Sequence, residues 1–125
     1  VSFSADGLGV GSGYYMLAPD QLDRFRRAVA DDVTGSELTR MVEALRRARY
    51  DVTAREVLKT APRGYPKDHP RVHLLRHKGL IVWRHWEPSG WLATSAAKGR
   101  VVEVLRAAQP LVAWLDAHVG PSSSR

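Results

Sequence analysis

Four glycines alternate with other residues in the stretch 7-GLGVGSG-13, and this spacing constrains the fold more than any other feature of the sequence. Residues two apart project from the same face of a β-strand. A strand through this stretch has one face without side chains, so either another group lies close against that face or the strand bends or bulges. The dipeptide Asp6-Gly7 is typical of a two-residue turn, which makes residues 1–17 a predicted β-hairpin.

Two amphipathic helices are predicted after the hairpin. Pro19 suits the first turn of a helix, where its missing N–H has no partner to lose, and this helix is expected to run to about Asp31. The capping box 34-TGSE-37 predicts the start of the second helix. The core-facing residues are Leu22, Phe25 and Val29 in the first helix, and Leu38, Met41, Val42 and Leu45 in the second. The short link between them predicts an antiparallel pair.

The second half of the chain predicts two further helices and a strand. Residues 50–57 are consistent with either strand or loop. Pro70 is expected to begin a two-turn helix that ends at His77, and Leu80–Trp86 is predicted to be a buried strand. A long helix is predicted from Thr94 to Val119, with a kink or break at Pro110. Its apolar stripe consists of Val101, Leu105, Ala108, Val112, Leu115 and Val119.

These elements predict a single α+β domain over residues 1–120 of the 125. A small antiparallel sheet, made of the N-terminal hairpin and the Leu80–Trp86 strand, would pack against the helix pair and the long C-terminal helix. Residues 121–125 are expected to form a frayed tail. The chain lacks cysteine, which excludes disulfides and thiolate chemistry and fits a cytoplasmic location. It also lacks the roughly 18 consecutive apolar residues of a membrane span, so no membrane association is expected.

The net charge of +6 is concentrated between residues 59 and 86. This segment holds seven of the nineteen Lys and Arg residues, four of the five histidines and one acidic residue, Asp68. Such a localised field favours an anionic partner such as a phosphate, a carboxylate or a nucleic acid. The alternative is that these side chains form an ordinary solvated surface.

The loop 62-PRGYPKDHP-70 is the predicted ligand site within this segment. Its prolines restrict the backbone, its glycine allows a ligand to approach, and its arginine offers a bidentate fork for an oxyanion. The residues predicted to bind are Arg63, Gly64, Tyr65, Lys67, His69, Arg71 and His73. The competing interpretation is that Asp68 only caps a helix while Arg63 and Tyr65 hold the loop to the core.

Metal and cofactor sites are not predicted. His69, His73 and His77 are four residues apart, but the outer two would lie roughly 12 Å apart on a helix, too far to share one ion. The glycine-rich stretch 7-GLGVGSG-13 lacks the strand–turn–helix context of a dinucleotide site and the lysine of a phosphate loop. No nucleophile–base constellation is evident, so no catalytic residue is predicted and enzymatic activity stays open.

Three tryptophans follow the basic loop. Trp83, Trp86 and Trp91 lie beside Arg84 and His85, an interleaving of aromatic and basic residues that single-stranded nucleic-acid surfaces use. We favour the alternative in which these tryptophans close one end of the core.

Three stretches resemble the bacterial domain-of-unknown-function family 2461: 7-GLGVGSGYYMLAPDQLDRFRRAVAD-31, 61-APRGYPKDHPRVHLLRHKGL-80 and 109-QPLVAWLDAHVG-120. The resemblance implies a soluble, cytoplasmic α+β protein without an established activity. Members of that family usually carry a further N-terminal portion, so we expect this chain to match the C-terminal part of the family pattern and to be a fragment. The hairpin would then leave an open sheet edge through which the chain could form a homodimer.

The leading functional hypothesis is a binding module for a small anionic ligand, a phosphate or a carboxylate, at the basic loop. The first alternative is nucleic-acid binding across the same face, which predicts an affinity that falls steeply with salt. The second is a hydrolase or transferase that uses His69 or His73 as a general base. The last is a purely structural or partner-binding protein.

Overall fold

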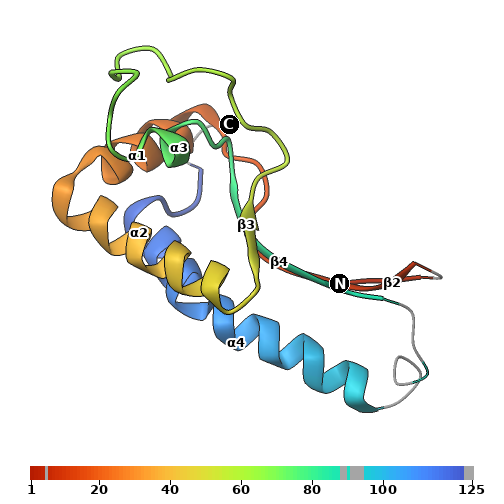
Figure 1. Cartoon of the computed structure of the whole chain (residues 1–125). Coiled ribbons are helices and arrows are strands. Elements are labelled where there is room, and N and C mark those ends of the chain that lie inside the picture. The colour runs from red at the N-terminus through yellow and green to blue at the C-terminus, as the bar shows by residue number, and fades with distance from the viewer. Residues whose placement is uncertain (5, 88–89, 91–94, 123–125) are drawn as a thin grey trace.

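A computed structural model describes residues 1–4, 6–87, 90 and 95–122. Its elements are β1 (Ser2–Ser4), β2 (Gly7–Tyr14), α1 (Pro19–Ala30), α2 (Asp32–Arg47), β3 (Asp51–Thr53), α3 (Val72–Leu75), β4 (Leu80–Trp86) and α4 (Ser95–His118). The strands form one antiparallel sheet in the order β1-β2-β4-β3. Helices α1 and α2 pack with the C-terminal half of α4, while its N-terminal half extends beyond them (Figure 1). The predicted α+β fold with a long C-terminal helix is confirmed.

The face of β2 that lacks side chains is covered by Trp83 from β4. Gly11 is the register partner of Trp83, and Gly9 pairs with His85, two residues further along β4. A Cβ at Gly11 would lie 2.7 Å from Cε3 of the Trp83 indole, and a Cβ at Gly9 would collide with the same ring. Another group therefore does lie close against this face, and the alternating glycines provide the room for it.

Gly7 is not part of the hairpin turn, although the dipeptide Asp6-Gly7 predicts it as the second turn residue. Ser4 is paired with Gly7, so Gly7 belongs to β2. Its φ of +114° and its close approach to the Trp86 carbonyl oxygen explain why a glycine is needed inside the strand. In the resulting sheet β1 lies at an edge, and the homodimer through that edge stays a prediction.

Helix α2 begins at Asp32, two residues before the predicted capping box. The N-cap is Asp31, whose Oδ1 accepts hydrogen bonds from the backbone amides of Val33 (2.9 Å) and Thr34 (3.2 Å). The amide of Thr34, followed by that of Val33, holds the pKa of Asp31 below its usual range. The Thr34 hydroxyl instead donates to the Ala28 carbonyl, 2.6 Å away. The prediction was wrong because an aspartate three residues upstream satisfies the same amides.

The other two helices also differ from the prediction. The helix expected from Pro70 to His77 is only the single turn α3, Val72–Leu75. Helix α4 runs without a break through Pro110, which is exposed, so water can reach the carbonyl that the proline leaves without a partner.

The buried face of α4 is rotated from the predicted stripe. Leu105 is 45% exposed, whereas Leu111 and Trp114 are buried. The indole of Trp114 buries more apolar surface than the side chain of Val112 would, and this favours the rotated face. Ala108, Leu115 and Val119 of the predicted stripe are in the core.

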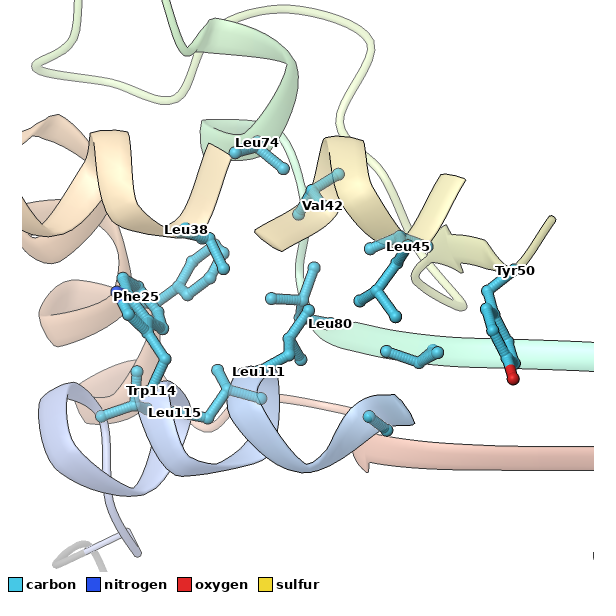
Figure 2. Close-up of a cluster of buried hydrophobic side chains, with 14 of the residues drawn as sticks. Phe25, Leu38, Val42, Leu45, Tyr50, Leu74, Leu80, Leu111, Trp114 and Leu115 are labelled. Carbon is cyan, nitrogen blue, oxygen red and sulfur yellow. The ribbon is translucent and has the colours of Figure 1, made fainter. Parts of the chain in front are cut away.

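The core lies between the sheet and the helices. Phe25, Leu38, Leu80, Leu111 and Leu115 are all fully buried, and they converge from α1, α2, β4 and α4 (Figure 2). The predicted core residues of α1 and α2 are confirmed, with Leu22 and Met41 at the half-buried margin.

The end of α4 is fastened to α1. Arg24 donates to the carbonyl oxygens of Val119 (2.6 Å) and Pro121 (2.8 Å), and Gln21 donates to that of Gly120 (2.9 Å). These bonds satisfy carbonyls that the end of a helix leaves without partners. Residues 123–125 of the expected tail lie outside the described residues.

Candidate functional site

The basic loop is closed at its base by backbone hydrogen bonds. The Leu58 amide donates to the Arg76 carbonyl (2.7 Å), and the Lys78 amide donates to the Glu56 carbonyl (3.0 Å). Between them Val57 and His77 form an antiparallel bridge. The segment that leads into the loop therefore lies beside the segment that follows α3. This pairing brings residues that are about 17 positions apart in sequence into one place.

A pocket of about 240 Å³ lies where these two segments meet. Its lining residues are Lys59, Thr60, Ala61, Lys67, Val72 and Arg76. Three of them carry a positive charge and none carries a negative charge. Among the residues that the structure describes, none of these three cations forms an ion pair with a carboxylate.

Arg76 is the most firmly placed of the three cations. Its Nε donates to the Leu58 carbonyl at 2.6 Å, and its own carbonyl accepts from the Leu58 amide. The side chain is half-buried, and no hydrogen bond within the described chain uses its two terminal nitrogens. A guanidinium fixed through Nε still presents a pair of donors to a carboxylate or phosphate.

The loop above the pocket is ordered by two turns. The Tyr65 amide donates to the Pro62 carbonyl, and the His69 amide donates to the Pro66 carbonyl, both at 3.2 Å. Pro62 is buried and Tyr65 packs against the core. Gly64 has a φ of +91°, a conformation that favours glycine over residues with a side chain.

Arg71 is used inside the fold. Its side chain is buried, and its guanidinium donates to the carbonyls of Val29 (2.5 Å) and Ala30 (2.9 Å) at the end of α1 and to Asp32 Oδ1 (3.1 Å). Gly35 makes room for it, because a Cβ there would collide with Nε of Arg71. The Arg71 guanidinium, which was predicted to contribute positive charge to a ligand site, therefore caps the end of α1.

The three evenly spaced histidines have different surroundings. His69 Nδ1 accepts a hydrogen bond from the Arg71 amide at 3.0 Å. The pKa of His73 is lowered from the ordinary value because nearby protein partly desolvates its imidazole and, next, because of the charge of Arg46, while Glu43 acts in the opposite direction. No cluster of three or more histidine, aspartate or glutamate side chains suited to a metal ion occurs within the described part of the chain.

His77 is buried, and its Nδ1 has no hydrogen-bond partner among the residues that the structure describes. Burial, followed by the nearby charges of Arg46, His73 and Arg76, lowers the pKa of His77 to about 4. An unfolded chain takes up this proton near pH 6.5, whereas the folded chain resists it until about pH 4. The free energy of unfolding should therefore fall by about 2–3 kcal/mol between pH 6.5 and 4 on account of this residue.

Urea denaturation between pH 4 and 8 would measure this dependence. His77→Leu should remove that part of the acid-side loss and leave stability above pH 7 little changed. His85→Leu alters an exposed histidine instead and should keep the loss. An unchanged acid slope in His77→Leu would show that other groups cause it.

The structure brings together only part of the predicted ligand set. Lys67 lines the pocket, and exposed Arg63 and Gly64 lie on the loop outside the lining. Lys59, Thr60 and Arg76 were not predicted as pocket residues. The charge excess between residues 59 and 86 includes both missed cations, but only the Leu58–Arg76 pairing shows that they meet.

The tryptophans do not form one platform. Trp83 lies on the glycine-lined face of the sheet. Trp86, three residues further along β4, projects from the opposite face and packs against the core. Trp91 lies outside the described residues. The preferred interpretation, in which the tryptophans close the core, is confirmed for Trp86.

The architecture is that of a small α+β protein with a basic pocket at the base of a Pro/Gly loop. The chain belongs to the family described as "Conserved hypothetical protein (DUF2461)", whose model matches residues 1–114. That description names no activity. No curated protein and no solved structure matches the chain.

None of the helices within the described residues has the length and apolar character needed to cross a membrane.

Proposed function

We propose that this protein binds a small anionic ligand, a phosphate or a carboxylate, in the pocket formed by Lys59, Thr60, Lys67 and Arg76. The observation that carries the proposal is the arrangement of three cationic side chains around one pocket of about 240 Å³, without a carboxylate among its lining residues. Like charges that converge repel one another, and an anion between them removes that repulsion.

The geometry of the pocket favours a small oxyanion. Arg76 is held by Leu58, so little of its rotamer freedom remains to be lost when a ligand binds. Thr60 adds a hydroxyl that can donate to an oxygen atom. Lys59 and Lys67 are exposed and both line the pocket, which suits an ion with several oxygens. Arg63, on the same loop, adds to the positive field.

The first test is a calorimetric titration of the chain with inorganic phosphate and with citrate. The variant carries Lys59→Gln and Lys67→Gln, which keep a polar side chain that is one atom shorter and remove its charge. Because a hydrogen bond to a charged group contributes about 1.5–3 kcal/mol, each loss should weaken binding by roughly ten- to hundredfold. Lys98→Gln, on exposed α4, is the matched control and should bind as the unaltered chain does.

Two results would contradict the proposal. One is the absence of heat from either anion with the unaltered chain, and the other is equal affinity in the double variant. A short single-stranded oligonucleotide belongs in the same series, because nucleic-acid binding uses the same positive field. Oligonucleotide affinity that falls steeply with salt, while phosphate and citrate do not bind, would assign the face to nucleic acid.

A further inference from the structure

A second pocket, of about 220 Å³, lies between α2 and α4 and is apolar. Its lining residues are Met41, Ala44, Leu45, Ala48, Tyr50, Ala107, Pro110 and Leu111. None of them is charged. Ala44, Ala48 and Ala107 are too short to fill the space between the two helices, which the larger Leu45 and Leu111 hold apart. A space bounded by small apolar side chains favours an apolar guest over water.

Tyr50 forms the wall of this pocket on the side of the sheet. It is buried and stands at one end of the core, beyond Leu45 (Figure 2). The Arg84 guanidinium lies over its ring, 5.1 Å from the centroid, and the same guanidinium lies 5.1 Å from the centroid of Trp86. The edge of the pocket therefore adjoins a cation that is held between two aromatic rings.

The charges around this edge favour an anion at Arg84. Within the described chain Arg84 has no ion pair with a carboxylate. Arg100, which lies over Trp86 at 6.0 Å, is paired with Glu103 at 3.2 Å. On the other side of Tyr50, a separate pocket has two arginines, Arg46 and Arg49, and one carboxylate, Asp51. The groups that face Tyr50 from both sides are thus mainly guanidinium groups.

We infer that the pocket between α2 and α4 binds the apolar part of a small amphiphile whose single anionic head is held by Arg84. A medium-chain carboxylate has this chemistry. Its chain would move from water into the alanine-lined space, and its carboxylate would meet the Arg84 guanidinium, which lies over the rings of Tyr50 and Trp86. A space of this volume suits a small molecule.

Titration with hexanoate, octanoate and decanoate, followed by protein NMR, tests this inference, with octanol as the uncharged counterpart. Each added methylene should tighten binding by about fourfold until the pocket is full. Octanoate should bind more tightly than octanol. Absence of octanoate binding at millimolar concentration, or shifts confined to residues outside α2, α4 and Tyr50, would overturn the proposal.

Three variants separate the parts of the site. Ala107→Leu fills the pocket and should weaken octanoate binding at least tenfold without lowering the melting temperature. Arg84→Gln should weaken octanoate but leave octanol unaffected, while Arg40→Gln, an exposed position on α2, is the charge-matched control. Equal octanoate affinity in Ala107→Leu would overturn the pocket, and equal affinity in Arg84→Gln would overturn the role of the head group.

Two further outcomes distinguish this site from other occupants. The Lys59→Gln, Lys67→Gln double variant should bind octanoate normally, so its behaviour separates this site from the anion pocket near Arg76. Dimerisation of the unaltered chain that Ala107→Leu abolishes would overturn the inference, because a second copy would then occupy the space.

Discussion

Replacing Arg71 by methionine is expected to lower the free energy of unfolding by about 2–6 kcal/mol, because one buried and one partly buried carbonyl lose their partner at about 1–3 kcal/mol each. Those carbonyls belong to Val29 and Ala30, at the end of α1. Methionine keeps much of the apolar stem but cannot donate. A loss of this size is a large fraction of the 5–15 kcal/mol typical of a folded domain. Urea denaturation followed by far-UV circular dichroism would measure it.

Two control variants define the source of the Arg71 effect. Asp32→Asn removes the ion pair but keeps both carbonyl bonds, and the Asp32 side chain is 96% exposed. It should cost less than about 1 kcal/mol. Arg63→Met makes the same chemical change on the exposed part of the loop and should stay within about 0.5 kcal/mol. A loss in Asp32→Asn equal to that in Arg71→Met would show that the ion pair, not the helix cap, carries the stabilisation.

Trp114→Ala is expected to destabilise the fold by about 3–5 kcal/mol. The indole is 3% exposed, meets the Phe25 ring edge-on with centroids 6.1 Å apart, and donates from Nε1 to the Thr34 carbonyl at 3.0 Å. It thereby joins α4 to both α1 and the start of α2. Truncation to alanine leaves a cavity and an acceptor without its donor. The midpoint of urea denaturation, with the slope checked for constancy, is the appropriate measurement.

Trp114→Phe separates packing from hydrogen bonding, because it keeps an aromatic ring and removes the N–H. It should cost less than the alanine variant. Val102→Ala, at a position of α4 that is 40% exposed, should change stability by less than about 1 kcal/mol. If all three substitutions cost the same, α4 would contribute through its backbone and not through this side chain.

The sequence predicted those elements whose signals are local. The bounds of β4 were predicted correctly as Leu80–Trp86, because β-branched and aromatic residues lie between two turn signals. The start of α1 at Pro19 was also correct. The rotated face of α4 could not be predicted, since Leu105 and Leu111 fit a helical stripe equally well and only packing against β2 and α2 selects between them.

The candidate site was predicted only in part, because some of its signals are local and others depend on tertiary structure. The composition of the basic, proline-rich loop is sufficient to predict a site there, and Lys67 of this loop does line the pocket. Arg71 could not be assigned, because its partners lie 39 to 42 residues away in sequence. Arg76 reaches the pocket through its backbone pairing with Leu58. A pairing of that kind follows from tertiary structure and not from a local motif.

The bonds that fasten the end of α4 to α1 also bear on how the chain folds. Arg24 and Val119 are 95 positions apart, and the Tyr14 hydroxyl donates to Asp116 Oδ1 (2.6 Å) across 102 positions. During synthesis, α1 and β2 emerge from the ribosome long before these partners exist. Contacts between distant parts of a chain slow folding, so this domain should acquire its final packing only after α4 has been released.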